Sequence, residues 1–102
     1  MDTTEKLKKI LIVDDQPEIT DVIEELIQLN YEVEIDTAIN VISALELVSK
    51  NIYNVICTDQ NMPGLNGTDF LREVRLSEGP NQSCPVVFIT ANPDDVKREL
   101  EA

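Results

Sequence analysis

The chain has 102 residues, of which 42% are hydrophobic, and its 8 Lys and Arg against 20 Asp and Glu, with no His, give a formal net charge of −12. This size and composition are typical of one small globular domain, so we expect a single domain over residues 1–102 with no output domain in the chain. So large a negative charge repels phosphate backbones and anionic lipid heads. The charge therefore argues against binding to nucleic acid or membranes and favours binding of cations.

Targeting and cysteine chemistry also give clear expectations. The first apolar run, Ile10–Val13, is far too short for a secretory leader or a membrane span. Cys57 and Cys84 lie far apart in a chain without His, so neither a zinc site nor a redox pair has its ligands. We therefore expect a cytoplasmic protein in which both thiols are packed as ordinary side chains.

The first half of the chain predicts two strand–helix pairs. Residues 8–13 are apolar and β-branched and stop at an acidic pair, as in a strand buried on both faces. A proline then suits the first helical turn, and apolar residues recur at helical spacing over 17–27. Residues 33–35 alternate apolar and acidic side chains, which is typical of an edge strand. A second apolar helical stripe runs over 41–48.

The second half predicts two more such pairs. Residues 53–58 are typical of another buried strand, and residues 62–67 have the composition of a turn. Asn66 is expected to cap a third helix, which ends before the next glycine and proline. Residues 85–89 form a fourth apolar run, and residues 94–101 follow a proline as a last short helix.

The resulting order, βαβαβαβα, predicts a mostly parallel sheet covered by helices on both faces. The last helix is expected to turn Val96 and Leu100 inward. If the strands at 33–35 and 53–58 lie on opposite sides of the strand at 8–13, a topological switch point forms between the strands at 8–13 and 53–58.

Polar residues follow three of these strands and are expected to meet at one edge of the sheet. Asp14 and Asp15 follow the first strand, Asp59 the third and Thr90 the fourth. Three like charges close together favour a cation among them, and carboxylate and carbonyl oxygens suit Mg²⁺. Because Mg²⁺ keeps exchangeable waters, the same site is suited to receiving a phosphoryl group, with Asp59 as the candidate nucleophile.

Three motifs resemble the receiver domains of two-component response regulators: Ile12–Asp15, Cys57–Gly64 and Phe88–Ala91. They occur in the family's order, at its spacing and on the right elements, and the resemblance covers the chain from about Lys8 to its end. It implies an α/β, flavodoxin-like doubly wound parallel sheet. Here four strands would alternate with four helices, and the chain would be truncated before a fifth strand.

The resemblance also implies roles for individual residues. Asp59 would be phosphorylated by a histidine kinase or a phosphotransfer protein. Asp15 and Asp59 would bind Mg²⁺ directly, Asp14 through a water, and Asn61 through its backbone carbonyl. Thr90 would offer its hydroxyl to the phosphoryl group. Such a protein signals by contact with a partner and is not an enzyme acting on a separate metabolite.

Residues near Thr90 complete this expectation and show where the family pattern stops. The small Ala91 would leave access to the site, and Asn92, like Asn61, would influence dephosphorylation by water. Receiver domains continue with a fifth strand, which carries a Lys that pairs with the phosphoryl oxygens, and a fifth helix. Lys97 is a poor substitute, because the rise of its helix carries it away from the site.

An uncovered edge is expected from the same departure. Without a fifth strand, the apolar strand at 85–89 becomes an edge of the sheet, and exposed apolar edges invite pairing. We therefore expect the chain to form a homodimer, or to bind a partner, through this strand and the sheet face that a fifth helix would cover.

Two other functions compete with the phosphoacceptor reading. A degenerate receiver would keep the fold and act, without phosphorylation, as an interaction or dimerisation module, which the missing Lys favours. A Mg²⁺-dependent phosphohydrolase of the haloacid-dehalogenase type would also use an Asp after its first strand. That family needs a second Asp two positions later and a much longer chain, whereas Asp14 is followed by Asp15 and Gln16.

Overall fold

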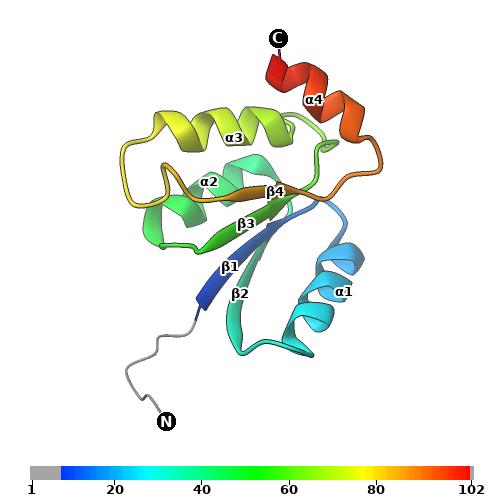
Figure 1. Ribbon diagram of the computed structural model, residues 1–102, viewed down its shortest axis with the longest axis vertical. Helices are drawn as coiled ribbons and strands as arrows, with labels where there is room; N and C mark the ends of the chain where they lie inside the picture. The colour runs from blue at the N-terminus through cyan, green and yellow to red at the C-terminus, as the bar shows by residue number, and fades with distance from the viewer. Residues whose placement is uncertain (1–7, 102) are drawn as a thin grey trace.

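A computed structural model describes residues 8–101, which form a parallel sheet of four strands that alternate with four helices (Figure 1). In chain order the elements are β1 (Lys8–Val13), α1 (Pro17–Gln28), β2 (Val33–Ala38), α2 (Val41–Lys50), β3 (Val55–Thr58), α3 (Gly67–Leu76), β4 (Val86–Phe88) and α4 (Pro93–Glu101). Within this part of the chain no helix is both long and apolar enough to cross a membrane.

The strand order is β2-β1-β3-β4, and every neighbouring pair is parallel. The predicted fold class is therefore confirmed: an α/β, flavodoxin-like doubly wound sheet with a switch point between β1 and β3. Val13, the last residue of β1, lies opposite Ala38 of β2 and Thr58 of β3. The strands consequently end level, and the loops that follow β1 and β3 start side by side.

Local sequence signals set where the helices begin. Pro17 occupies the first turn of α1, as predicted. Asn66 caps α3 and forms a capping box with Asp69, in which each side chain accepts a backbone N–H of the other at 2.9 Å. Asn40 caps α2 by accepting the Ser43 N–H at 2.8 Å, a cap that the sequence analysis did not anticipate.

The hydrophobic core lies mainly between the sheet and the two helices α2 and α3, which cover one face, while α1 covers the other (Figure 1). Most of its members are apolar residues that helical or strand spacing turns toward this interface, and two, Tyr53 and Cys84, come from the loops before β3 and β4. They include Leu11, Val13, Ala38, Val41, Ala44, Tyr53, Ile56, Phe70, Val74 and Cys84, all buried. The sequence pattern thus identifies most of this side of the core.

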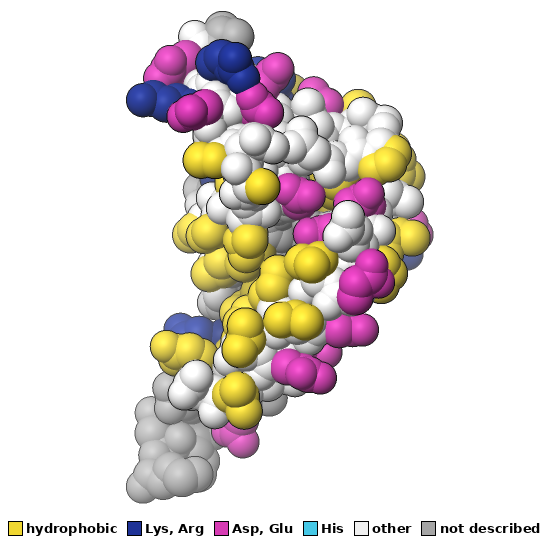
Figure 2. Space-filling model, turned by 90° about the vertical axis from the view of Figure 1, so that its right-hand side faces the viewer, with side chains coloured by type: hydrophobic (Ala, Val, Ile, Leu, Met, Phe, Trp, Pro, Cys, Tyr) yellow, Lys and Arg dark blue, Asp and Glu magenta, His cyan; other side chains and the backbone are white. Residues whose placement is uncertain are grey.

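The face that carries α1 is less well covered than the predicted amphipathic pattern implies. Val22 is 53% exposed and Leu26 60% exposed, and Thr20 is the one residue of α1 that is fully buried. Figure 2, which faces this side, shows hydrophobic side chains gathered along it with acidic side chains beside them. Among the described helices α1 alone packs here, so part of its apolar stripe meets solvent.

Two predictions about element ends are wrong. Leu100 is 49% exposed, although Val96 is buried as expected. The last turn of α4 is held to α3 by the Arg72 side chain, which donates to the Glu99 carbonyl at 2.7 Å, but Leu100 lines an open hollow between the two helices. The strand predicted over 53–58 begins only at Val55. The two residues before Val55, Tyr53 and Asn54, form hydrogen bonds in a polar network instead of extending the strand.

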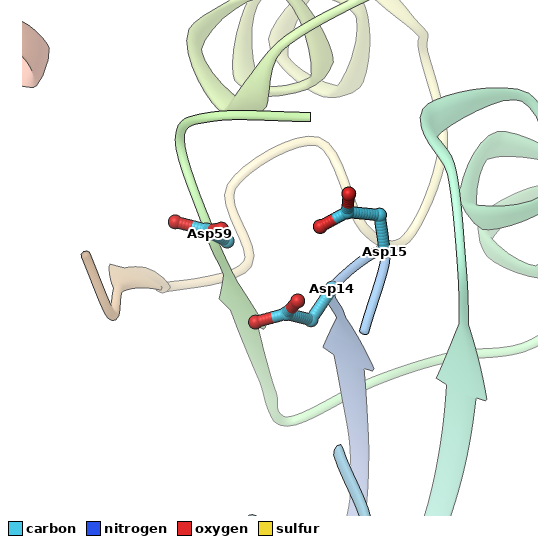
Figure 3. A group of neighbouring side chains, drawn as sticks. All are labelled: Asp14, Asp15 and Asp59. Carbon is cyan, nitrogen blue, oxygen red and sulfur yellow. The ribbon is translucent and has the colours of Figure 1, made fainter. Parts of the chain in front are cut away.

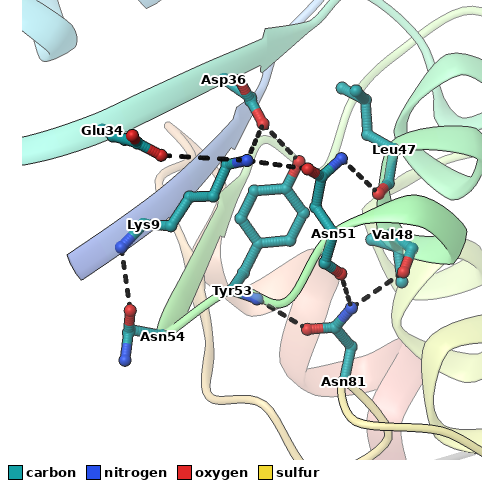
Figure 4. A network of polar contacts seen from close by, with 9 residues as sticks. All are labelled: Lys9, Glu34, Asp36, Leu47, Val48, Asn51, Tyr53, Asn54 and Asn81. Carbon is teal, nitrogen blue, oxygen red and sulfur yellow. Dashed lines mark hydrogen bonds and ion pairs between the residues drawn. The ribbon is translucent and has the colours of Figure 1, made fainter. Parts of the chain in front are cut away.

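That network lies at the amino ends of β1 and β3, opposite the strand ends that carry the acidic residues (Figure 4). Tyr53 donates its hydroxyl to Asp36 at 2.7 Å, and the Lys9 ammonium donates to the Asn51 side chain at 2.7 Å and lies 3.6 Å from Asp36. Asn81 accepts the Tyr53 N–H at 2.9 Å and donates to the Asn51 carbonyl at 2.6 Å. Four segments are tied together by these bonds.

The network predicts a loss of stability at alkaline pH. Burial, and then the hydrogen bond to Asp36, raise the pKa of Tyr53 above its usual value near 10. Because the folded-state pKa is the higher one, its contribution is complete below pH 10 and falls as the pH rises further, by up to about 1.4 kcal/mol per pH unit. Tyr53→Phe is expected to reduce this fall and to cost about 1–2 kcal/mol at neutral pH. The remaining fall comes from Cys57 and Cys84, because burial also raises the pKa of both thiols. Urea unfolding between pH 8 and 11 measures the fall and the cost, with exposed Tyr31→Phe as the control; an unchanged alkaline fall in Tyr53→Phe would contradict the assignment.

Candidate functional site

Three carboxylates meet where β1 and β3 end, as the sequence predicts. Asp14 and Asp15 follow β1 and Asp59 follows β3, and one oxygen of each lies within 4.8 Å of the others (Figure 3). The backbone hydrogen bonds between the strands continue one residue beyond the strand ends. The Asp59 N–H donates to the Val13 carbonyl and the Asp14 N–H donates to the Ala38 carbonyl, both at 3.0 Å, and these bonds fix the backbone of both aspartates.

The surroundings of the cluster concentrate negative charge. Asp14 is 7% exposed, whereas Asp15 and Asp59 are half-buried. Burial is the main cause that raises the pKa of Asp14, and the charges of Asp59 and Asp15 raise it further, while a hydrogen bond from the Gln16 N–H at 2.9 Å opposes them. Asp14 is not the cap of α1, since the N-cap residue is Gln16. An ordinary capping role therefore does not explain why the acids gather here.

A cavity of about 280 Å³ opens beside the cluster. It is lined by Asp14, Asp59, Asn61 and Thr90 among the predicted site residues, together with Gln16, Ile19, Ile89 and Ala91. Thr90 is half-buried, and its hydroxyl oxygen accepts the Asn92 N–H at 3.2 Å. The structure thus brings the acceptor candidate, the hydroxyl and the Asn61 loop to one hollow.

Lys97 and Asn92 line a different hollow, beside α4. Lys97 therefore lies apart from the acids, as its distance along the helix predicts. No Lys or Arg is among the residues that line the cavity at Asp59, within the part of the chain that the structure describes.

Two residues near Asp59 escaped the sequence analysis. Gln60 is only 2% exposed, and its side-chain amide contacts Thr68 in the first turn of α3. Gly67 lies so close to the Asp59 carbonyl that a Cβ there would overlap its oxygen. Neither residue belongs to a periodic pattern, and the composition of 62–67 indicates only a turn. A polar residue directly after a strand-ending acid was the one available signal.

The donor set suits a hard divalent cation. Three carboxylates supply oxygens within 4.8 Å of one another, and oxygen atoms of this kind are the ligands that Mg²⁺ prefers. Asn61, whose carbonyl is a further candidate ligand, lines the cavity beside them. A cation would also relieve the repulsion that like charges impose on the buried Asp14. Carboxylates, a hydroxyl and an open cavity together are the parts required for binding a metal and a phosphoryl group.

Comparison with known proteins finds relatives that this chain resembles over most of its length. The chemotaxis protein CheY-3 of Vibrio cholerae is 35% identical over 97 residues, which cover 92% of this chain and 69% of that protein. The CpxR homolog of Haemophilus influenzae, a transcriptional regulatory protein, is 33% identical over 94 residues, but this chain spans only 39% of its length. The similarity to CpxR is therefore to one part of a longer protein.

Solved structures extend the likeness to three dimensions. The chemotaxis response regulator CheY4 of Vibrio cholerae superimposes with a TM-score of 0.78 at 26% identity, covering 93% of this chain and 80% of that one. A receiver protein from Pseudomonas putida, at 15% identity and a TM-score of 0.83, shows the fold alone. The family profile described as the response regulator receiver domain matches residues 10–102. The chain therefore belongs to the response regulator receiver domains of two-component signalling.

Proposed function

We propose that this chain is a phosphoacceptor. It takes a phosphoryl group from a phosphohistidine of a histidine kinase or phosphotransfer protein onto Asp59, requires Mg²⁺, and signals by protein contact rather than as an enzyme acting on a separate metabolite. The observation that carries the proposal is the placement of Asp59, which lies with Asp14 and Asp15 within 4.8 Å and lines one cavity with Thr90.

The transfer exchanges a phosphorus–nitrogen bond of the donor for a phosphorus–oxygen bond to Asp59. A carboxylate oxygen of Asp59 attacks phosphorus, the phosphorus–nitrogen bond breaks, and the imidazole nitrogen keeps the bonding electron pair. The Thr90 hydroxyl donates a hydrogen bond to a phosphoryl oxygen. Asp14, Asp15, Asp59 and the Asn61 carbonyl would hold Mg²⁺, with Asp14 acting through a water, and the ion supplies neutralisation of the charge on the phosphoryl oxygens.

The backbone around Asp59 supports its role as acceptor. The Gln60 N–H donates to Asp59 Oδ1 at 2.7 Å and so orients the carboxylate. Little covalent chemistry is asked of the protein in phosphoryl transfer, so a fixed acceptor next to a charge-neutralising site is the main requirement.

Intact mass spectrometry tests the proposal. After incubation with a small-molecule phosphoryl donor and Mg²⁺, we expect the wild-type chain to gain one phosphoryl group and to gain none when the metal is removed. Asp59→Asn is expected to gain none. Asp94→Asn, which removes an exposed carboxylate on α4, is the matched control and should be phosphorylated like the wild type.

The alternative is a receiver that works without phosphorylation as an interaction or dimerisation module. No Lys or Arg among residues 8–101 lines the cavity at Asp59, which favours this alternative because a phosphoryl group there would lack a cationic side chain beside it. Folded protein that binds Mg²⁺ but gains no phosphoryl group would select this alternative over the first proposal.

For a protein partner we propose a second copy of the chain, paired along β4. The Ile89 amide and the Pro85 carbonyl face β3, so the amides and carbonyls of Val86 and Phe88 face the outer edge of the described sheet. No charged side chain interrupts this strand. Val86 packs against the core beneath α2 and α3, so alternation along the strand turns Val87, which is 49% exposed, to the opposite face of the sheet. Uncharged, exposed edges of this kind are those that pair.

Sedimentation equilibrium tests the dimer. We expect association at micromolar concentration that strengthens with salt, because the chain carries a net charge of −12. Val87→Lys should weaken it at least about tenfold through repulsion at the edge. Ile42→Lys, at an exposed apolar site on α2 away from this edge, should not. A monomer throughout this range contradicts the pairing.

A further inference from the structure

We propose that Gln60 is a positioning residue of this site: its side-chain amide holds the loop after Asp59 against the start of α3 and so sets where the Asp59 carboxylate and the Asn61 carbonyl lie. The inference rests on the proposed function, because the groups that Gln60 places are those assigned there to the metal and the phosphoryl group.

Gln60 satisfies the start of α3 from outside the helix. The first N–H groups of a helix have no partner within it. Here the Gln60 carbonyl accepts the Gly67 N–H at 3.0 Å, and its side-chain oxygen accepts the Thr68 N–H at 2.9 Å. The capping residue Asn66 accepts the next one, from Asp69. One residue next to the acceptor thus supplies two of the three partners that this helix end receives.

Both polar atoms of the Gln60 side-chain amide form hydrogen bonds with Thr68. While its oxygen accepts the Thr68 N–H, its nitrogen donates to the Thr68 hydroxyl at 3.2 Å, and that hydroxyl donates to Asn66 at 2.8 Å. Gln60 is 2% exposed and Thr68 is fully buried. Such a two-point contact between buried groups fixes the amide in position and orientation, because either bond, if lost, leaves a buried polar group unpaired.

The same residue reaches the site in the other direction. Its N–H donates to Asp59 Oδ1 at 2.7 Å, and its carbonyl carbon forms the peptide bond to Asn61. Asn61 is exposed, and none of the hydrogen bonds found among residues 8–101 involves it. The position of the Asn61 carbonyl is therefore set by its two neighbours in the chain. Met62 is held by packing in the hydrophobic core, and Gln60 is held by directed hydrogen bonds, which fix its orientation as well as its place.

A purely structural Gln60 gives a different expectation. It would contribute to the free energy of unfolding like other buried polar residues, without altering the affinity for a metal. A positioning role predicts weaker metal binding in the folded protein, since partners that orient metal ligands typically account for a factor of 10 to 100 in affinity. The two roles are separated by measuring Mg²⁺ affinity and stability together.

The experiment uses the full chain and three variants near Gln60. Gln60→Met keeps the length of the side chain and removes both polar atoms. Thr68→Val removes the hydroxyl alone, and Thr68→Ser restores it. Tyr53→Phe is the matched control, because it loses a buried hydrogen bond at the opposite end of β3. Calorimetric titration with MgCl₂ gives the dissociation constant, and intact mass against time gives the rate of phosphoryl uptake at saturating Mg²⁺.

Gln60→Met is expected to weaken Mg²⁺ binding by about tenfold and to slow phosphoryl uptake. Thr68→Val should show a smaller effect and Thr68→Ser should recover wild-type affinity, while Tyr53→Phe loses stability only. Equal Mg²⁺ affinity in Gln60→Met and the wild type would overturn the inference. If the wild type binds Mg²⁺ but gains no phosphoryl group while Gln60→Met binds more weakly, the proposed function fails and the positioning role stands. A wild type that binds no Mg²⁺ overturns both.

Discussion

Replacing Gly67 by alanine is expected to destabilise the fold by about 3 kcal/mol, at the upper end of the range for overpacking. Gly67 does not have a positive φ, so the cost is one of space. An added Cβ would overlap the Asp59 carbonyl oxygen and would lie 2.9 Å from the Phe88 ring and 3.0 Å from the Gln60 side-chain oxygen. Two of these neighbours are the acceptor and the residue that anchors its loop.

The effect on function should follow the same contact. Because the backbone of Asp59 must move to accept the methyl group, phosphoryl uptake by Gly67→Ala is expected to slow even at temperatures where the protein is folded. Gly64→Ala is the matched control: Gly64 has a φ of 82° and open space around it, so alanine there costs about 1–2 kcal/mol of backbone strain without touching the site. Urea unfolding and timed intact mass measure both effects; equal uptake by the two folded variants would contradict this account.

The part of the site that sequence predicts is the part that strand ends determine. Asp14, Asp15, Asp59 and Thr90 each follow an apolar strand, and parallel strands present all their carboxyl ends at one edge, so their meeting follows from periodicity and topology alone. The sequence also predicts the helix starts at Pro17 and Asn66, because each start depends on a few neighbouring residues.

The contacts that sequence did not predict join residues through the fold. Gln60 meets Thr68 across a turn, and Tyr53 meets Asp36 and Asn81 through three separate segments, with no spacing rule to mark either. The exposure of Leu100 was missed for another reason. Helical spacing identifies which face of a helix is apolar, but the element that covers that face is a property of the assembled fold.

For the acidic cluster, we expect Mg²⁺ to reverse the order of stability of the wild type and Asp14→Asn. Without metal, burial and the charges of Asp59 and Asp15 make the ionised Asp14 unfavourable, as its raised pKa shows. Asp14→Asn keeps an oxygen that accepts the Gln16 N–H and removes the charge, so the metal-free variant is expected to be more stable than the metal-free wild type. On the proposed function, the acids therefore lower the stability of the metal-free fold, and a bound cation would offset that loss.

With Mg²⁺ at roughly 100 times its dissociation constant, the wild type is expected to gain about 2.7 kcal/mol in free energy of unfolding, because the ion binds the folded state alone. Asp14→Asn lacks one of the carboxylates and should gain much less, so the order of the two proteins reverses. Asp94→Asn should gain as much as the wild type. Urea unfolding in MgCl₂ and in NaCl of matched ionic strength separates binding from screening of the −12 net charge. Equal gains in the free energy of unfolding in MgCl₂ and NaCl would show that the carboxylates hold no ion. Screening depends on ionic strength alone, whereas ion binding depends on the three carboxylate oxygens that meet at the ends of β1 and β3.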